Sequence, residues 1–392
     1  MSVFSNKPGV YITGVSQVEV KKKTEQSLKE LGSKVIKEAI IDSGIEKIDA
    51  LYVGNMLSGT LNNQQQLGSL LANASDLKGI DAVTLEAACG SGGAALRIGY
   101  MAIMSGLCEN VVVCGVEKMS HSNKEFITQS IATASDWDLE GSKGETFVTL
   151  NSYLMKMYMN RYNLNSDSFA MFGVNAHQNA LLNHFSLLKK NITFDDYKNA
   201  PYIAEPVKML DASPICDGAA ALVLSKYPKE KKTIPDVKII ASACATESVS
   251  INGRIDPLNA DGILNSGKKA YFMAGIKPKD IDFFELHDAY SIISALSLEA
   301  MGFAEKGNGW RLAADGEIAL NGKIPVSTFG GLKARGHPIG ASGIYQAVES
   351  YLQLTGTAGE NQIKKDPKVG LIQSIGGTAS TAITHIMVNS NY

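Results

Sequence analysis

The chain has 392 residues, 45% of them hydrophobic, which is enough for two or three domains with a large buried core. Its 37 Lys and Arg residues nearly balance 39 Asp and Glu residues, and the formal net charge of −2 gives no electrostatic reason to expect binding to nucleic acid or an anionic membrane. The expected partners are therefore small molecules or other proteins.

The five cysteines form no CxxC pair, and their odd number fits a reducing compartment better than a disulfide framework. The same spacing gives no sign of a structural metal site. The N-terminus lacks a secretory pattern, and no apolar run reaches the roughly 18 residues of a membrane-spanning helix. We expect a cytoplasmic protein without a membrane segment.

The first part of the chain alternates between strand and helix patterns. In chain order these are a strand at 10–15, a helix around 31–40, a strand at 50–53, a short helix at 67–71, a strand and helix around Cys89, and a strand at 111–116. Such alternation predicts an α/β fold with a mainly parallel sheet covered by helices on both faces.

The pattern changes after this part of the chain. Residues 120–143 are polar and aperiodic, whereas 153–162 and 168–184 show helical spacing, and we interpret 118–212 as an insertion that covers the site as a lid. An apolar strand returns at 217–224, and a charged linker is expected at 226–235.

The opening order then repeats. The segment PDVKII at 235–240 echoes PGVYIT at 8–13, and the helix and strand pattern at 268–284 echoes the one at 34–52. The protein is thus predicted to contain two copies of one α/β unit. The resulting domains are an N-terminal half of 1–117 and 213–232, an inserted loop domain of 118–212, and a C-terminal half of 233–392.

Each copy contains a glycine-flanked helix start. Cys89 opens one in the sequence CGSGG, and His337 opens the other in HPIGASG. At a helix start, unpaired N–H groups and the positive end of the helix dipole stabilise a thiolate and a developing oxyanion. For an arbitrary cysteine, a buried and unreactive role is more common, so partners elsewhere in the chain must decide.

Two of the six histidines follow the ends of predicted elements in the second copy. His287 comes directly after the strand pattern IDFF, and His337 lies in its glycine-rich turn. Ligands of open α/β sheets bind at the carboxyl ends of strands, so both side chains are expected near Cys89. A cysteine with a histidine suits acyl transfer, because imidazole moves protons near neutral pH.

Other candidates carry weaker signals. His121 lies in the polar loop, where it can contact a ligand, whereas His177 and His184 are expected to be surface or packing residues and His385 a structural one. The sequence GILNSGK at 262–268 fits GxxxxGK but lacks the following Ser or Thr and a preceding strand, so it is interpreted as a chance match at a helix entry.

Lys333 and Arg335 precede the His337 turn. Two cations there can steer a phosphorylated ligand, although cations on an exposed loop are as often simply solvated.

These motifs together resemble the thiolases over essentially the whole length. The resemblance rests on Cys89, on DGAA at 217–220, on GHPIGASG at 336–343 and on the glycine pair at 376–377. The pair His287-Asp288 is similar to the sterol-carrier-protein type and the archaeal acetoacetyl-CoA thiolases. The resemblance implies a thiolase fold, in which two repeated α/β halves form a five-layered α-β-α-β-α structure with an inserted loop domain.

The resemblance also implies roles for individual residues. Cys89 is the acylated nucleophile, His337 the base that activates it, and His287 the residue that helps to hold the thioester oxygen of the second substrate. The backbone N–H groups of Cys89 and Gly376 form a second oxyanion hole. The positions assigned to oxyanion or substrate binding are Gly376, Ser374, Ser120 and Gly331, and no metal ligand is assigned.

The implied reaction condenses two acetyl-CoA molecules to acetoacetyl-CoA and CoA, or runs in reverse as thiolysis, through an acetyl-Cys89 intermediate. Coenzyme A thioesters are then substrates, and no cofactor is expected. The implied setting is lipid metabolism and the mevalonate pathway. The implied partners are a second or further copies in a homodimer or homotetramer, and by analogy an OB-fold acyl-CoA-binding protein and a hydroxymethylglutaryl-CoA synthase.

Two other readings remain open at this stage. One is a thiolase-like acyltransferase or aldolase with a different acceptor, and the other is a poorly active acyl-CoA-binding scaffold subunit. The joint presence of Cys89, His287 and His337 argues against the scaffold, because binding alone needs no nucleophile.

One departure from the family pattern affects the mechanism. Ser374 and Ala289 stand where thiolases carry the second cysteine that exchanges the α-carbon proton. A serine hydroxyl is too weak an acid for this exchange. The role must pass to His287 or His337 or be absent, and our hypothesis is that a histidine takes it.

Overall fold

The computed structural model describes residues 9–229 and 234–389. Within them, nine strands form one sheet in the order β3-β2-β4-β7-β1-β8-β11-β10-β9, and two short strands pair separately. The strands are β1 (Val10–Gln17), β2 (Ala50–Gly54), β3 (Asp81–Leu85), β4 (Asn110–Glu117), β5 (Tyr202–Ala204), β6 (Val207–Lys208), β7 (Gly218–Ser225), β8 (Val237–Thr246), β9 (Phe283–Glu285), β10 (Val369–Gly376) and β11 (Thr381–Asn389).

The helices of the described residues surround and divide this sheet. They are α1 (Leu28–Ser43), α2 (Ser58–Leu61), α3 (Leu67–Ala74), α4 (Ser91–Met104), α5 (Lys124–Ala132), α6 (Phe147–Tyr162), α7 (Ala170–Leu181), α8 (Phe194–Lys198), α9 (Asp261–Ala274), α10 (Ser291–Ala300), α11 (Gly309–Ala314) and α12 (Ser342–Thr355). In the part of the chain that the structure describes, no helix is both long and apolar enough to cross a membrane.

The expectation of a mainly parallel sheet is wrong. Only β2–β3, β2–β4 and β9–β10 run parallel, whereas β1–β7, β4–β7, β1–β8, β8–β11 and β10–β11 are antiparallel. The strand β11 follows β10 through a tight turn with no crossover helix, and β7 returns from the insertion beside β4. Both arrangements reverse the strand direction, so the sheet is mixed.

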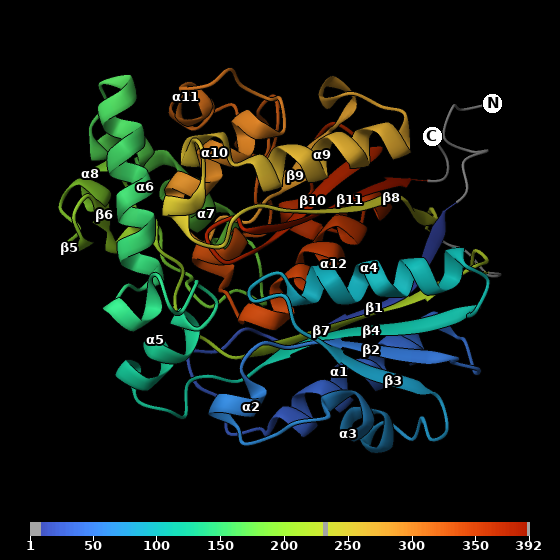
Figure 1. The fold of residues 1–392 in the computed structure, drawn as a ribbon. Helices are drawn as coiled ribbons and strands as arrows, with labels where there is room; N and C mark the ends of the chain where they lie inside the picture. Colours follow the sequence, from blue (N-terminus) through green and yellow to red (C-terminus); the bar gives the residue numbers. More distant parts are fainter. Residues whose placement is uncertain (1–8, 230–233, 390–392) are drawn as a thin grey trace.

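The strand order confirms the internal repeat. Reading outward from the central β1–β8 pair, the order β1-β7-β4-β2 on one side corresponds to β8-β11-β10-β9 on the other. Figure 1 shows that the strands of the two halves, although joined in one sheet, lie in two separate layers. From one side to the other, the five layers are α9 and α10, the strands of the C-terminal half, α4 and α12, the strands of the N-terminal half, and α1 to α3. The predicted five-layered α-β-α-β-α fold is therefore confirmed, while the residue boundaries of the three domains stay a prediction.

The central helices α4 and α12 come into direct contact where they begin. A Cβ at Gly92 would lie 2.8 Å from the carbonyl oxygen of Gly340, and a Cβ at Gly343 would lie 2.4 Å from the backbone nitrogen of Gly93. Glycine is required because the two backbones approach too closely for any side chain. The turns of Cys89 and His337, one from each half, thus meet in the middle layer.

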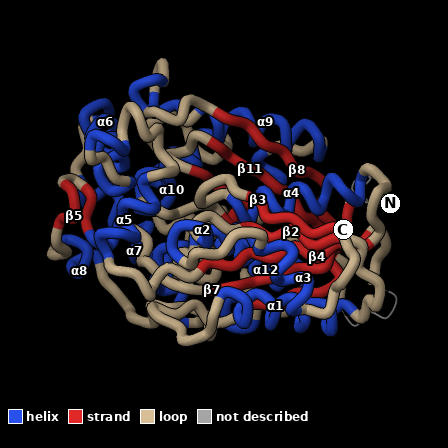
Figure 2. Tube along the Cα trace, turned by 60° about the horizontal axis from the view of Figure 1, so that its bottom comes forward, coloured by secondary structure: helices blue, strands red, loops and turns tan. Residues whose placement is uncertain are grey.

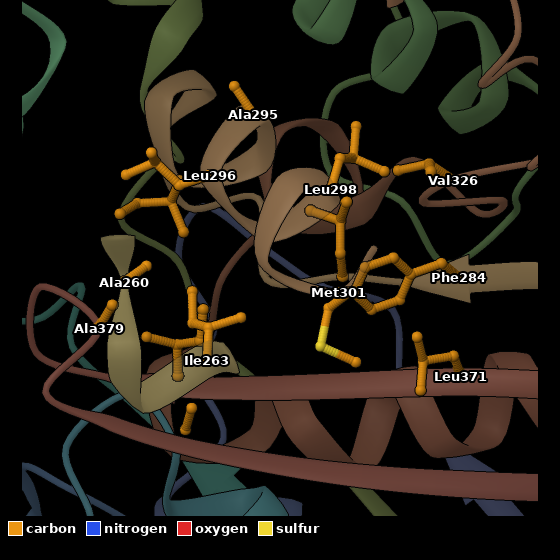
Figure 3. Close-up of a cluster of buried hydrophobic side chains, with 14 of the residues drawn as sticks. Ala260, Ile263, Phe284, Ala295, Leu296, Leu298, Met301, Val326, Leu371 and Ala379 are labelled. Carbon is orange, nitrogen blue, oxygen red and sulfur yellow. The ribbon is translucent and has the colours of Figure 1, made fainter. Parts of the chain in front are cut away.

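The outer layers are held by apolar side chains. In the C-terminal half, α9 packs on β8 and β11 and α10 packs on α9, and all of these elements contribute to a large buried cluster, part of which is seen in Figure 3. Burial of each Val, Leu, Ile, Phe or Met side chain of this cluster stabilises the fold by about 1.5–3 kcal/mol. The labelled members are Ala260, Ile263, Phe284, Ala295, Leu296, Leu298, Met301, Val326, Leu371 and Ala379.

The inserted segment gathers at one end of the strands, where α5, α6, α7 and α8 lie together in Figures 1 and 2. The helix α5 was not expected, because 120–143 looks polar and aperiodic. Asn123 caps it by accepting a hydrogen bond from the Phe126 N–H at 2.8 Å. Part of the predicted linker, 230–233, lies outside the described residues.

Candidate active site

Cys89 lies in a tight turn between β3 and α4, as the sequence predicts. Ala88 adopts a left-handed conformation with φ of 52°, which turns the chain sharply ahead of the helix. The Ser91 hydroxyl fixes this turn, since it accepts from the Ala87 N–H at 3.0 Å and donates to the Ala88 carbonyl at 2.6 Å. Cys89 is buried, and only 8% of the residue's surface is exposed.

His337 lies at the corresponding helix start of the other half. Its Nδ1 lies 2.6 Å from the hydroxyl of Ser342, and that hydroxyl donates its hydrogen to the Pro338 carbonyl at 3.1 Å. The hydroxyl therefore accepts from Nδ1–H, which places the lone pair of neutral His337 on Nε2. This Nε2 is buried and has no hydrogen-bond partner among the described residues, so it is free to act as a base.

His287 follows β9 and is held in the opposite tautomer. Its Nδ1 accepts a long hydrogen bond, 3.4 Å, from the backbone N–H of Ile375 in β10. The remaining proton of the neutral ring is then on Nε2, where it can be donated to a substrate oxygen. The two histidines thus supply one lone pair and one N–H to the same site.

The three side chains lie close together. The Sγ of Cys89 and one ring nitrogen each of His287 and His337 all lie within 4.8 Å of one another, and the two rings meet edge to face with centroids 5.1 Å apart. The structure therefore brings together three residues that are distant in sequence. A nucleophile, a base and a hydrogen-bond donor in one buried site are the groups that acyl transfer needs.

Burial sets the protonation of all three. It raises the pKa of the Cys89 thiol to about 12, with a smaller contribution from the charge of Glu117, and lowers the pKa of His287 to about 3. Burial, then His287 and Arg335, hold the pKa of His337 well below 6.5. Cys89 therefore rests as a thiol beside a neutral base, and not as the thiolate that its helix start suggested.

Cysteine and histidine are also zinc ligands, and in the described residues this is the group of three whose spacing suits a metal ion. A metal ligand must offer a lone pair. The hydrogen bond from Ile375 places a proton on the outer nitrogen of His287, so the arrangement fits proton transfer better than metal binding.

A cavity of about 200 Å³ opens from these residues. Its lining is mostly apolar, and much of it comes from the insertion, including Phe147 and Asn151 of α6. Tyr290, which sequence reasoning did not assign, also lines it beside His287. The insertion thus forms a wall of the cavity, whose mostly apolar lining suits a narrow, largely apolar ligand.

The other predicted site residues lie at different distances from this cavity. Gly376 packs against the Cys89 turn, where its Cβ would lie 2.4 Å from the Ala87 carbonyl. Ser374 points between α4 and α12 and donates to Gln346 at 3.2 Å, and it does not line the cavity. A Cβ at Gly331 would lie 2.3 Å from the carboxylate of Asp288.

Ser120 also lies outside the cavity, in a neighbouring groove with Lys21. Its hydroxyl donates to the carboxylate of Asp217, and its backbone N–H donates to the same group at 3.0 Å. These hydrogen bonds tie the start of the insertion to the start of β7.

Both readings of Lys333 and Arg335 are wrong, because neither side chain is at the surface. Lys333 is buried and donates to the Asp211 carbonyl, and fully buried Arg335 pairs with Glu349 at 2.7 Å. Charged side chains of this kind are inside only when they are paired, and the sequence pattern could not show their partners.

Three of the four remaining histidines bind backbone carbonyls through their rings. The Nε2 of His121 binds the Leu61 carbonyl at 2.7 Å, that of His385 binds the Gly93 carbonyl at 3.2 Å, and His177 is buried against the Lys190 carbonyl. His184 is exposed. The GxxxxGK-like sequence at 262–268 lies within α9 and not in a loop between a strand and a helix, which agrees with its interpretation as a chance match.

Comparison with known proteins agrees with this geometry. The model of the thiolase N-terminal domain matches residues 10–227, and that of the thiolase C-terminal domain-like family matches 243–389. An acetyl-CoA acetyltransferase of Methanothermobacter thermautotrophicus is 40% identical over 380 residues, which cover 96% of this chain and 98% of that protein.

Sterol carrier protein 2 of Oryctolagus cuniculus is 28% identical over 409 residues, covering 96% of this chain and 71% of that protein. Among solved structures, the Ltp2-ChsH2(DUF35) aldolase superposes with a TM-score of 0.83 at 22% identity, covering 98% of both chains, and so shares the fold. With family models matched along both halves and a relative at 40% identity, the chain belongs to the thiolase family.

Proposed function

We propose that this protein is an acetyl-CoA C-acetyltransferase, which condenses two acetyl-CoA molecules to acetoacetyl-CoA and CoA or catalyses the reverse thiolysis. The observation that carries this proposal is the meeting of Cys89, His287 and His337 at the end of a mostly apolar cavity. The name of the 40% identical relative supports the same substrate. A scaffold role is not favoured, because binding an acyl-CoA requires neither a nucleophilic cysteine nor a base beside it.

In the first step, Sγ of Cys89 attacks the carbonyl carbon of acetyl-CoA. Because the pKa of this thiol is raised, its proton must leave during the attack, and the free Nε2 of His337 is the acceptor. The bond from the carbonyl carbon to the CoA sulfur then breaks. The CoA thiolate recovers the proton from His337, which leaves acetyl-Cys89 and free CoA.

In the second step, a base removes a proton from the α-carbon of a second acetyl-CoA. The resulting carbanion attacks the acetyl carbon on Cys89, and the Cys89 thiolate leaves and recovers a proton. In this proposal, Nε2 of His337 takes the α-proton and returns it to the Cys89 thiolate, and Nε2–H of His287 donates to the thioester oxygen of the enolate; the tautomers of the two rings support these roles. Ser374 has no part in this step, because its hydroxyl is directed at Gln346.

The reaction is tested by incubating the protein with acetyl-CoA and measuring CoA release and acetoacetyl-CoA formation together. We expect the two products in equal amounts, and their loss in His337→Ala. Release of CoA without acetoacetyl-CoA would contradict the condensation and favour a different acceptor.

The proposal extends to the partners and location of the protein. We propose a homodimer or homotetramer, because β3 is an edge strand whose Val83 is 44% exposed, and Met101 and Met104 of α4 are exposed as well. An OB-fold acyl-CoA-binding protein and a hydroxymethylglutaryl-CoA synthase are proposed associates. Sedimentation of the purified chain, alone and with either partner, tests these assemblies.

The five cysteines are all free, which supports a reducing, cytoplasmic location.

A further inference from the structure

Glu117 is a fully buried carboxylate at the end of β4 that does not line the cavity. Its two oxygens accept four hydrogen bonds. Oε1 accepts from Asn55 Nδ2 at 3.0 Å and from the Leu57 N–H at 3.1 Å, and Oε2 accepts from the N–H groups of Met56 and Gly340, both at 3.0 Å. Every donor is oriented toward the charged form of the side chain.

These four donors belong to different halves of the protein. Residues 55–57 follow β2 of the N-terminal half, and Leu57 packs in a small apolar cluster with Cys89 and Ile339. Gly340 belongs to the C-terminal half and lies three residues after His337, in the turn that opens α12. A Cβ at Gly340 would lie 2.7 Å from Oε2 and 2.6 Å from the Asn55 Cα, so the turn sits directly on this carboxylate.

We propose that Glu117 is a positioning residue that ties the His337 turn to the Cys89 side of the active site and so sets the distance between base and nucleophile. This inference rests on the proposed function, because it concerns the proton transfer from Cys89 to His337. Near-attack geometry is sensitive to such a tie, since a misplacement of about 1 Å costs on the order of 100-fold in rate.

The geometry predicts that glutamine cannot replace this carboxylate. In either orientation, the amide nitrogen of Gln would face two N–H donors and could accept a hydrogen bond from neither. If the amide nitrogen replaces Oε2, the N–H groups of Met56 and Gly340 lose their acceptor and the turn of His337 is released. If it replaces Oε1, Asn55 and Leu57 lose theirs and the loop at residues 55–57 is released. Aspartate keeps the charge but is one methylene shorter, and it cannot reach both sides at once.

The charge of Glu117 also acts on Cys89, and the reactivity of the Cys89 thiol therefore reports on Glu117 independently of catalysis. The negative charges of Glu117 and, more weakly, Glu86 disfavour the Cys89 thiolate. Removing the charge of Glu117 should therefore make the thiol more reactive toward a small alkylating agent, while the enzymatic reaction becomes slower. Loss of structure would also expose the buried Cys89 to alkylation, so the comparison with Glu117→Asp, which loosens the contact but keeps the charge, separates the two causes.

The experiment compares wild type, Glu117→Gln, Glu117→Asp and the control Glu86→Gln. It measures kcat and KM for condensation, the rate of Cys89 alkylation by iodoacetamide at pH 8, and thermal unfolding. For Glu117→Gln we expect kcat to fall on the order of 100-fold with KM changed less than about threefold, while alkylation becomes faster. Glu117→Asp should lose kcat without faster alkylation, and Glu86→Gln should keep kcat.

The proposal is overturned if folded Glu117→Gln keeps kcat within about threefold of wild type, or if kcat and alkylation fall together. If Glu117→Gln does not fold, the test uses Glu117→Asp instead, and a kcat within about threefold of wild type overturns the proposal. Failure of the proposed function is distinguishable, because it would appear as an absence of condensation in the wild type itself.

Discussion

At the scale of single residues, burial determines the chemistry of the site more than local sequence does. The helix start at Cys89 suggested a stabilised thiolate, but the cavity wall and the nearby carboxylate raise its pKa to about 12. A thiol that is not ionised at rest must be activated by a base, which is the role that the free Nε2 of His337 fits.

This protonation state predicts the reactivity of Cys89 toward iodoacetamide. Because its pKa lies far above neutrality, the thiolate fraction should rise about tenfold for each pH unit. We expect the alkylation rate of the free enzyme to keep rising between pH 6 and pH 9. The measurement follows the modified Cys89 peptide by mass spectrometry, with the less buried Cys244 as an internal comparison. A plateau with a midpoint below pH 7 would instead indicate a preformed thiolate–imidazolium pair.

The replacement of the usual second cysteine by Ser374 gives another residue-scale prediction. Ser374 is bonded to Gln346 and does not line the cavity, so Ser374→Ala should exchange the α-protons of bound acetyl-CoA at nearly the wild-type rate. His287→Ala or His337→Ala should lower this exchange by about 100- to 10,000-fold. Deuterium uptake into acetyl-CoA in heavy water measures it, and a comparable loss in the serine variant would refute the assignment.

At the scale of elements, the sequence predicted what local periodicity controls. The main strands, α1 and the two glycine-flanked helix starts lie where their patterns indicated. The helix α5 was missed because its apolar face is short. Lys333 and Arg335 were misjudged because the groups they bind, the Asp211 carbonyl and the Glu349 carboxylate, are distant in sequence. Glu117 left only a weak signal, as a carboxylate at the end of an apolar strand.

The contact between α4 and α12 makes an element-scale prediction about stability. A methyl group at Gly343 would meet the backbone of α4, which cannot move aside, so Gly343→Ala should lower the free energy of unfolding by about 1–3 kcal/mol. The control Gly267→Ala in α9 would meet only the flexible end of Met301, and we expect a much smaller change. Denaturant unfolding of both variants provides the comparison, and equal stabilities would contradict the tight contact.

At the scale of the whole molecule, the repeat was visible in the sequence, but the direction of the strands was not. Echoes such as 235–240 with 8–13 indicated two related halves, and the corresponding strands β8 and β1 pair at the centre of the sheet. Strand direction depends on how the insertion and the final hairpin return to the sheet. The meeting of His287 and His337 with Cys89 followed from the expectation that strand ends share one edge.

The central claim is that the two halves place Cys89 and His337 together so that the cysteine accepts an acetyl group. The most direct test is to incubate the protein with acetyl-CoA alone and measure the intact mass, beside Cys89→Ala. We predict one added acetyl group on the wild type and none on the variant, with the modification mapped to Cys89. An unmodified wild type, or an adduct that persists in Cys89→Ala, would contradict the account.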